Sequence, residues 1–369
     1  MCAKDTYRTA TGSSPRMHGN IEPSLKKQRG TVGQSEQPDQ DTTVFAAFKH
    51  MLLAGAATPC KITKETKIHM KLSNILQDKA LTLSFEVFPP KSDADFESVK
   101  DAAYRVAALQ PSYMSVTYGA GGSTAGNTRT IAEGIQKQYD VPTVAHLTCV
   151  GATKQSIREA LAAMRDCGVE NVLALRGDRP TWMEGEPFTD YHYASELVAT
   201  IRDFGGFCVG GACYPEGHPD AANKHEDILN LKKKVDAGCD FLTTQMFFDN
   251  NIFYNFLFHA REAGITVPII PGIMPITRAT QVKNAVKLSG CHMPERFINI
   301  VDHFGSDKEA MQQAGIIYAT DQIIDLIANG ITHIHVYSMN NAKVAQGIQD
   351  NLSAILGKTP EGVFANGAD

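Results

Sequence analysis

The sequence predicts a closed parallel (β/α)8 barrel, and three observations support this fold class. Short apolar runs rich in strand-forming residues begin at Leu81 and alternate with longer segments of helical periodicity. There are eight such runs, which is the number of strands that closes this kind of barrel. None of them is followed by G-x-G-x-x-G, the fingerprint of the rival open doubly wound sheet, and GAGGST at 119–124 does not match it.

Each strand is expected where β-branched and aromatic residues cluster between turn residues. The runs are LTLSFEVF from Leu81, YMSVTYG from Tyr113, PTVAHLTC from Pro142, NVLALRGD from Asn171, FCVGGACYP from Phe207, FLTTQMFFD from Phe241, VPIIPGIMP from Val267 and HIHVYSMN from His333. Helices are expected between them, for example at 95–109 and 228–237, with the capping residues Ser123 and Thr153 near helix starts. Residues 276–329 are too long for one crossover. The prediction is therefore a TIM barrel with additional helices before the last strand.

The chain is expected to have three parts. Residues 1–69 form an N-terminal extension that we predict to be largely disordered, because residues 1–42 are polar and lack large apolar side chains. Within it, residues 44–57 are apolar and could form an extra helix, and Met70 is a plausible native start. Residues 70–360 form the barrel, and residues 361–369 form a C-terminal tail.

Composition indicates a globular protein and argues against several classes of partner. Of the 369 residues, 43% are hydrophobic and 20% are charged. Basic residues outnumber acidic ones by 11 to 6 in residues 1–71, whereas acidic residues lead by 34 to 24 in the rest. An acidic barrel predicts no nucleic-acid partner. No apolar run reaches the roughly 20 residues of a spanning helix, so no membrane association is expected. Eight scattered cysteines suggest reduced thiols in the cytoplasm.

Polar and glycine-rich clusters follow most of the predicted strands, at the end where barrel active sites lie. Glu86 lies within the apolar run SFEVFPP. Partial burial should raise the pKa of this carboxyl group and suit it to proton donation near neutrality. The alternative is a carboxylate paired with an Arg or Lys across the barrel mouth, and the sequence pattern does not separate the two. Asp178 follows Arg176, so a local ion pair is the alternative for that residue.

Histidines and lysines offer weaker signals. His146 is more often a buried structural histidine than a metal ligand, and no carboxylate partners surround it in the sequence. His333 and His335 share one face of a strand but lack a third ligand, so no metal is expected. Lys232, Lys233 and Lys234 are most simply a solvated helix face, and they are also a basic cluster near the barrel rim that a pyrophosphate could use.

Taken together, eight motifs resemble the bacterial methylenetetrahydrofolate reductase family. They are SFEVFPPK, VTYGAGGST, AHLTCVG, LALRGD, YPEGHP, LKKKVDAGCDFLTTQMFFD, PGIMPI and HVYSMN. They occur in the expected order between about Leu81 and Leu356, which covers the barrel. The resemblance implies an oxidoreductase of one-carbon metabolism and methionine synthesis. It would carry hydride from NADH or NADPH through FAD to 5,10-methylenetetrahydrofolate in a ping-pong cycle.

The resemblance also implies roles for individual residues. Glu86 matches the general acid, Asp178 the acid that contacts the pterin near the flavin, and Gln245 an amide shared by folate and nicotinamide. The implied folate contacts are Gln245, Gln281, Thr117 and Tyr337. The implied FAD contacts are Thr117, Tyr118, Ala120, His146, Arg176, Gly177, Asp178, Tyr193, Ala194, Tyr214, His218, Ala221, Asp227, Asn230, Lys233 and Lys234.

The chain departs from the bacterial pattern at two places. The segment after LALRGD is longer, and Asn341 stands where the bacterial enzymes carry Arg. This puts the usual contact to the folate tail in doubt, and Arg278 and Lys343 are the nearest cations in sequence that could replace it. A flavin-free pterin-binding barrel methyltransferase is the alternative function. The sequence does not separate NADH from NADPH, and a homo-oligomer is compatible with it.

Overall fold

The computed structural model describes residues 71–77, 80–90, 95–118, 125–179 and 184–356, all of which belong to one compact unit, Lys67–Asp369. The predictions for the extension 1–69, the helix at 44–57, the tail 361–369, Ser123 and Ala120 lie outside these residues.

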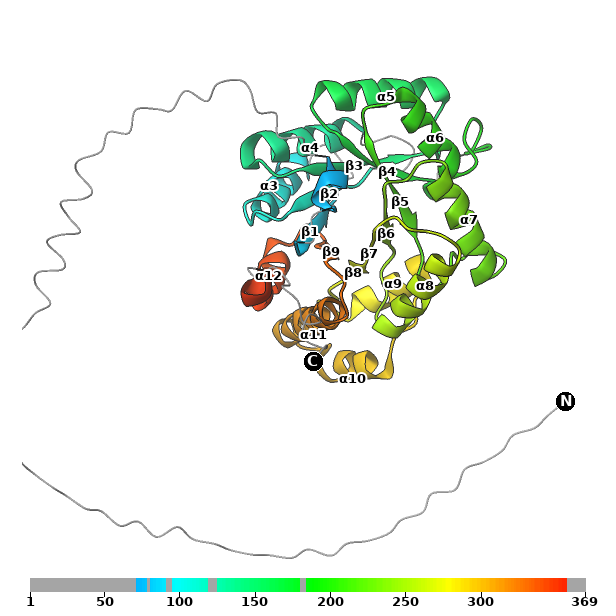
Figure 1. Ribbon diagram of the computed structural model, residues 1–369. Helices are drawn as coiled ribbons and strands as arrows, with labels where there is room; N and C mark the ends of the chain where they lie inside the picture. The colour runs from blue at the N-terminus through cyan, green and yellow to red at the C-terminus, as the bar shows by residue number, and fades with distance from the viewer. Residues whose placement is uncertain (1–70, 78–79, 91–94, 119–124, 180–183, 357–369) are drawn as a thin grey trace, which may run out of the picture. The chain divides into compact units, whose positions relative to one another are not determined.

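The strands form one parallel sheet that curls into a barrel (Figure 1). Its strands are β1 Thr82–Val87, β2 Tyr113–Val116, β3 Thr143–Thr148, β4 Asn171–Leu175, β5 Cys208–Cys213, β6 Phe241–Thr244, β7 Ile269–Ile270, β8 Gly272–Ile273 and β9 His333–Tyr337. The first strand pairs with β2 on one side and with β9 on the other, starting at Thr82 beside His333. The predicted (β/α)8 TIM barrel is confirmed.

The barrel closes along a seam where the seventh predicted strand divides at Pro271. β7 pairs with β6, whereas β8 pairs with β9. Pro271 has no amide hydrogen, but its carbonyl oxygen accepts from the His335 amide at 3.0 Å. On the other side, the Gly272 amide donates to Thr244 Oγ1 at 2.9 Å, and the Tyr337 hydroxyl donates to the Thr244 carbonyl oxygen at 2.5 Å. Side-chain hydrogen bonds thus complete the ladder here.

Helices surround the strands (Figure 1). They are α2 Leu72–Ile75, α3 Phe96–Ala107, α4 Ala125–Tyr139, α5 Lys154–Asp166, α6 Ala194–Phe204, α7 Lys224–Asp236, α8 Asn250–Glu262, α9 Thr280–Ser289, α10 Glu295–Phe304, α11 Lys308–Ala328 and α12 Ala342–Leu356. Between β8 and β9 lie α9, α10 and α11, which confirms the additional helices before the last strand.

Capping explains where two helices begin. The Thr153 side chain accepts from the Ser156 amide, and the Ser156 side chain accepts from the Thr153 amide. Helix α5 therefore starts at Lys154, directly after the predicted capping residue. The helix predicted at 228–237 starts earlier, at Lys224, because the Asn223 side chain caps it by accepting from the Glu226 amide at 2.9 Å.

The short helix α2 closes the N-terminal end of the barrel. Leu72 and Leu76 pack with Tyr113, Phe241 and Ile270, which lie at or near the starts of their strands. The Leu72 amide also donates to the Asn171 side chain at 2.6 Å. With this end filled by apolar side chains, the opposite end of the barrel is left for a site.

The described residues include six cysteines, and their helices can be examined for a membrane-spanning segment. Cys149, Cys167, Cys208, Cys213, Cys239 and Cys291 are free thiols, five of them buried. Among the helices that the structure describes, none combines the length and apolar character needed to cross a bilayer.

Helix α11 approaches the loop after β8 so closely that only glycine fits at position 315. A Cβ there would collide with the Ile276 carbonyl oxygen and lie 2.7 Å from its carbon, and both are backbone atoms that cannot rotate away. We expect Gly315→Ala to lower the free energy of unfolding by about 1–3 kcal/mol. In the control, Gly126→Ala on α4, the added Cβ has no neighbour within 4 Å and should be neutral or slightly stabilising. Urea unfolding measures both, and equal stability of the two variants would contradict the expectation.

Candidate active site

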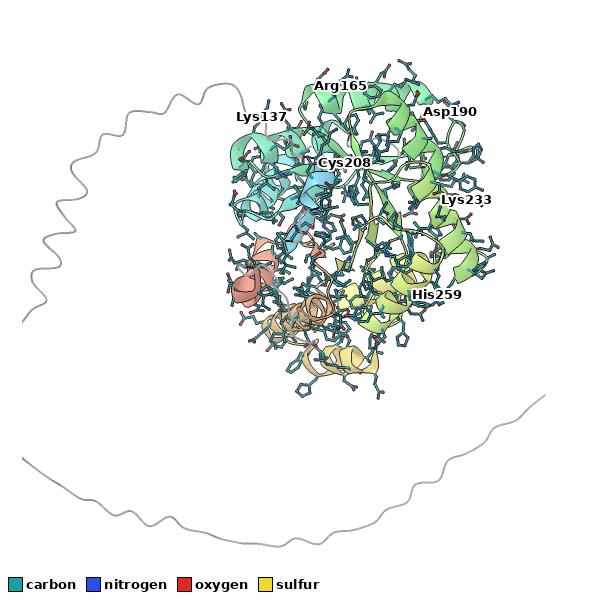
Figure 2. The ribbon with its side chains drawn as sticks, viewed as in Figure 1. Lys137, Arg165, Asp190, Cys208, Lys233 and His259 are labelled. Carbon is teal, nitrogen blue, oxygen red and sulfur yellow. The ribbon has the colours of Figure 1, made fainter. Side chains whose placement is uncertain are left out.

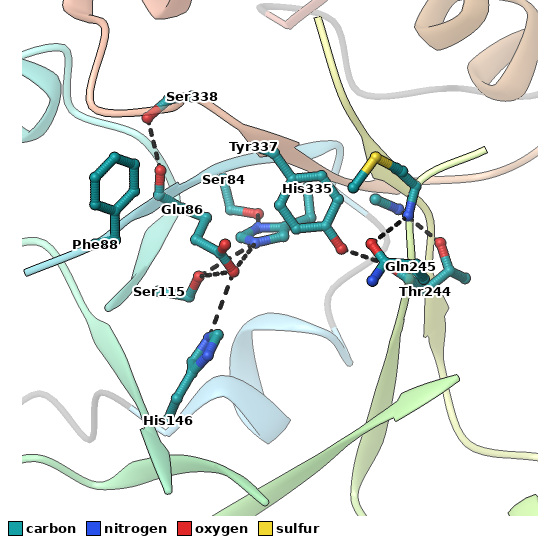
Figure 3. Close-up of polar contacts among 12 residues, drawn as sticks. Ser84, Glu86, Phe88, Ser115, His146, Thr244, Gln245, His335, Tyr337 and Ser338 are labelled. Atoms are coloured by element: carbon teal, nitrogen blue, oxygen red, sulfur yellow. Dashed lines mark hydrogen bonds and ion pairs between the residues drawn. The ribbon is translucent and has the colours of Figure 1, made fainter. Parts of the chain in front are cut away.

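The candidate site lies at the C-terminal ends of β1, β2, β3 and β9. Glu86 is the penultimate residue of β1, and the parallel register places it beside Ser115 of β2 and Tyr337 of β9. Since alternate residues of a strand share a face, Ser84 and Glu86 point the same way, as do His335 and Tyr337. The inward-facing residues of neighbouring strands therefore meet at one place, as Figure 3 shows.

The backbone around Glu86 is held in place by residues that directly follow β9. The Ser338 hydroxyl donates to the Glu86 carbonyl oxygen at 2.6 Å. The Asn340 side chain donates to the Phe88 carbonyl oxygen and accepts from the Phe88 amide, each at 2.9 Å. Asn340 does this from a left-handed backbone conformation with φ 54°, which asparagine tolerates better than most residues. This double hydrogen bond holds the end of β1 against the turn after β9.

The Glu86 carboxylate faces two imidazole rings and a hydroxyl group (Figure 3). Its Oε2 lies 3.5 Å from His146 Nε2 and 3.8 Å from His335 Nε2. The Ser115 hydroxyl is 3.3 Å from the same oxygen and 3.2 Å from His335 Nε2, so it bridges the acid and the ring. Two basic groups and one acid thus share a nearly enclosed space.

This arrangement corrects the predicted pKa of Glu86. Burial acts to raise the pKa, as expected from the apolar run around it. The hydrogen bond with His335, the charges of the two histidines and the Ser115 hydroxyl oppose burial, and the pKa of Glu86 is lowered below its ordinary value. The sequence suggested either a desolvated acid or a carboxylate paired with Arg or Lys. The structure shows a carboxylate paired with histidines.

The hydrogen bonds around His335 assign its tautomer. The Ser84 hydroxyl donates its single hydrogen to the Ile334 carbonyl oxygen at 2.9 Å. It can therefore only accept from His335 Nδ1, which lies 2.8 Å away, so Nδ1 carries a hydrogen. His335 Nε2 is the other ring nitrogen, and it faces Ser115 and Glu86. The Tyr113 ring stacks parallel to the imidazole with centroids 6.0 Å apart and fixes its plane.

Two buried polar atoms on β3 have no hydrogen-bond partner among the described residues: His146 Nε2 and Thr148 Oγ1. The 3.5 Å approach of His146 to Glu86 is close enough for attraction but does not meet hydrogen-bond geometry. Burial lowers the pKa of His146, which favours a neutral ring. Because unpaired buried polar atoms are costly, this pair indicates a place where a polar ligand completes the site.

Gly177, at the end of β4, lies beside these atoms. It adopts φ +76°, and a Cβ there would lie 2.7 Å from Val150 Cγ1 and 3.1 Å from Thr148 Cβ. Glycine is therefore required here both by the left-handed backbone conformation and by the packing of the Val150 and Thr148 side chains. The unpaired Thr148 hydroxyl beside Gly177 and the unpaired His146 Nε2 are the atoms here that fit a polar cofactor such as a flavin.

The local ion pair considered for Asp178 does not form. The Arg176 guanidinium instead donates to Asp220 at 2.6 Å and lies over the Phe188 ring, 5.5 Å from its centroid. Asp178 is exposed. It lies close enough to Tyr214 to add to the rise in the pKa of that phenol, of which burial is the main cause. Asp178 is therefore available to a ligand at the mouth.

The ends of β5 and β6 contribute a second group of residues. The Tyr214 ring meets the His218 ring edge-on at 4.6 Å, and Asp227 accepts from the His218 amide at 3.1 Å. Burial raises the pKa of Asp227 and lowers the pKa of His218. Gln245 follows β6, is half-buried, and accepts from the Met246 amide with its side-chain oxygen at 2.9 Å.

The three lysines of α7 point in different directions and do not form one basic cluster. Lys232 pairs with Asp236 at 2.5 Å, and Lys233, exposed on the outer side in Figure 2, donates to Asn230 at 3.0 Å. Lys234 turns inward and donates to the Ala212 carbonyl oxygen at 2.6 Å. Burial lowers the pKa of Lys234. Of the three, only Lys234 enters the barrel wall.

The other predicted contacts are distributed along the same end of the barrel. Thr117 and Tyr118 follow β2 and are half-buried, and burial raises the pKa of Tyr118. Tyr193 is 65% exposed and precedes α6, whose first residue, Ala194, is buried. Ala221 donates its amide to the His218 carbonyl oxygen. Gln281 lies on α9, and its side-chain oxygen accepts from the Thr277 amide at 2.9 Å.

Sequence reasoning missed Ser84, Ser115 and the position of His335 beside Glu86. The available signal was the alternation of polar residues at Ser84 and Glu86, and again at His335 and Tyr337, within otherwise apolar strands. The sequence pattern alone points to His335 only as a possible metal ligand. Within the part of the chain that the structure describes, no group of three or more His, Cys, Asp or Glu side chains could hold a metal ion.

Comparisons with known proteins agree on one family. The family model described as methylenetetrahydrofolate reductase matches residues 71–353. The Zea mays protein "Methylenetetrahydrofolate reductase (NADH) 1" is 37% identical over 78% of this chain and 51% of its own length. The Escherichia coli "5,10-methylenetetrahydrofolate reductase" is 34% identical over 73% of this chain and 89% of its own length. The chain thus spans about half the length of its plant relatives and most of the bacterial one.

A solved structure supports the fold. It is described as an uncharacterized protein from Clostridium thermocellum that binds two copies of 5-methyl-5,6,7,8-tetrahydrofolic acid. It superposes with a TM-score of 0.53 at 16% sequence identity, covering 77% of this chain and 98% of its own. At this identity, the likeness shows a shared barrel fold alone.

Proposed function

The chain belongs to the methylenetetrahydrofolate reductase family, and we propose that it reduces 5,10-methylenetetrahydrofolate to 5-methyltetrahydrofolate with electrons from a nicotinamide, passed through bound FAD in a ping-pong cycle. The single observation that carries this proposal is the Glu86 carboxyl at the barrel mouth, held beside His335, Ser115 and His146. Opening the five-membered ring of the folate requires a proton donor, and this cluster of acid, hydroxyl and imidazole groups can relay a proton to the substrate through Glu86.

FAD would be held along the C-terminal ends of β2 to β5. His146 Nε2 and Thr148 Oγ1 are buried polar atoms that would gain partners. Tyr214, His218 and Lys234 continue the wall beyond β4. When bound there, FAD would supply hydride transfer between the two substrates.

The protein's own contribution to the folate step would be proton supply and orientation. Glu86 Oε2 and His335 Nε2 lie 3.8 Å apart, and the Ser115 hydroxyl lies within hydrogen-bond reach of both. Ser84 orients the imidazole through Nδ1, while Ser338 fixes the Glu86 backbone. Burial raises the pKa of the Tyr337 hydroxyl, so it stays protonated and keeps its hydrogen bond to Thr244 across the seam. Gln245 and Asp178 would orient the substrate at the mouth.

The first test is the absorbance spectrum of the purified protein. We expect a flavin spectrum that anaerobic NADH or NADPH bleaches and methylenetetrahydrofolate restores. Titration with each nicotinamide in turn would identify the donor. A colourless protein that transfers a methyl group from a folate to a corrinoid would instead support the flavin-free methyltransferase and contradict this proposal.

A further inference from the structure

Helices α10 and α11 form a helical hairpin outside the ring of strands (Figure 1). A barrel strand needs one following helix, whereas three lie between β8 and β9, so the hairpin contains a helix that the barrel itself does not require. Residues 305–307 connect the two helices. Two contacts hold them together: the Phe297 and Tyr318 rings lie 4.6 Å apart, and Arg296 pairs with Asp321 at 2.8 Å.

The outer face of α11 is apolar for a surface that faces solvent. The charged residues of this helix of 21 residues are Lys308, Glu309, Asp321 and Asp325. A helix that is apolar on nearly all sides is normally enclosed. Ile317 and Ile324 share one face of α11, yet they are 55% and 41% exposed. On α5, by contrast, every exposed residue is polar or charged. The outer face of α11 therefore has the composition of a covered surface.

Helix α10 extends this apolar surface across the groove between the two helices. Arg296, Ile300 and Phe304 follow one another at four-residue intervals and so lie on one side of α10. That side faces the groove, because Arg296 reaches Asp321 and its guanidinium lies 5.5 Å from the centroid of the Tyr318 ring. Phe304 is 37% exposed and Ile300 is half-buried. The groove thus combines apolar side chains with one exposed ion pair.

The two sides of the groove match at each level. Because the helices run antiparallel, one turn from the Arg296–Asp321 pair toward the connection leads to Ile300 on α10 and to Ile317 on α11. A twofold axis along the groove places α11 of one copy on α10 of a second copy at the same level. Asp321 then faces Arg296 of the second copy, and Ile317 faces Ile300 of the second copy. Opposite charges and apolar side chains both meet their complements.

We infer that two copies of this chain associate through their α10–α11 hairpins. A twofold interface uses the same patch on both copies, so the patch must be complementary to itself. The groove meets this requirement, because its positive charge lies on one helix and its negative charge on the other. Two helical hairpins that pack in this way form a four-helix bundle. The patch is small, so we expect a reversible dimer with a Kd on the order of 10 µM. This association depends on neither a flavin nor a folate.

Sedimentation velocity of the full chain over about 1–200 µM measures the association, and the dimer fraction should rise across this range. Ile317→Asp should raise the Kd at least about 10-fold, because it buries a charge without a partner. Leu288→Asp is the control, since Leu288 is 64% exposed on α9, outside the hairpin, and this variant should associate as the unaltered chain does. A chain that stays monomeric throughout would overturn the inference, as would an Ile317→Asp variant with an unchanged Kd.

Charge reversal tests the twofold arrangement itself. Asp321→Arg places two positive charges in the groove, and Arg296→Asp places two negative charges there. Each variant alone should be monomeric, because like charges meet across the axis. An equimolar mixture should form a heterodimer, which native mass spectrometry identifies by its mass. Both variants lack the intramolecular ion pair in the mixture as well, so restored association cannot arise from refolding. A mixture that stays monomeric, or a single variant that still dimerises, would overturn the inference.

Discussion

Glu86→Gln is expected to reduce the rate of flavin reoxidation by methylenetetrahydrofolate about 100- to 10,000-fold, while flavin content and reduction by the nicotinamide stay near normal. Glutamine keeps the size of the side chain but cannot release a proton in this pH range, and general acid catalysis typically contributes this much. Only the folate half-reaction needs a proton donor, so the two half-reactions should separate. Anaerobic stopped-flow absorbance measures each of them alone.

The matched control is Glu97→Gln on α3. Glu97 is an exposed carboxylate whose partner is Lys100, and neither residue is among those that meet at the mouth. It should leave both half-reactions unchanged. If Glu86→Gln reoxidises the flavin at an unaltered rate, Glu86 is not the acid, and the proposed mechanism loses its main support.

His335→Gln is expected to make the folate half-reaction strongly pH-dependent. In the unaltered protein, the His335 hydrogen bond and the charges of both histidines hold the pKa of Glu86 below its ordinary value against burial. Removing His335 leaves burial less opposed, so the pKa of Glu86 should rise. The variant nevertheless loses the imidazole Nε2 that lies beside Ser115 and Glu86, through which a proton can reach the acid.

The sign of the pH effect follows from these two changes. Above the pKa of Glu86 the variant has no proton to donate, and below it the carboxyl group is protonated again. We expect a loss of about 10- to 100-fold at pH 8 and a smaller loss at pH 6. Glu86→Gln should be slow at both pH values. This difference separates the residue that donates the proton from the one that positions and supplies it.

The control is His333→Gln, two residues earlier on β9. His333 Nδ1 contacts the Thr82 hydroxyl at 3.0 Å, at the other end of the strand pair from the mouth. It should not alter the pH profile of the folate half-reaction. If the pH profile of the folate half-reaction in His335→Gln is parallel to that of the unaltered protein, His335 has only a packing role.

Much of the fold could be predicted from local sequence. Strand positions followed from short β-rich runs, because a strand buried on both faces requires a continuous apolar segment. The extra helices before β9 followed from chain length alone. What local sequence did not predict was the division of the seventh strand at Pro271. Its two halves pair with different neighbours, which only the closure of the barrel makes possible.

The sequence by itself determined the fold class, the family motifs and the end of the barrel where polar residues collect, since each depends on residues close together in the chain. Only the tertiary structure decided the ionisation of Glu86, because its partners come from β2, β3 and β9, and parallel register sets their distances. Tertiary structure likewise brings Arg278 and Lys308, which belong to separate elements, to the lining of one cavity. A pKa and a binding surface depend on which groups meet in space, and those groups lie up to about 250 residues apart in this chain.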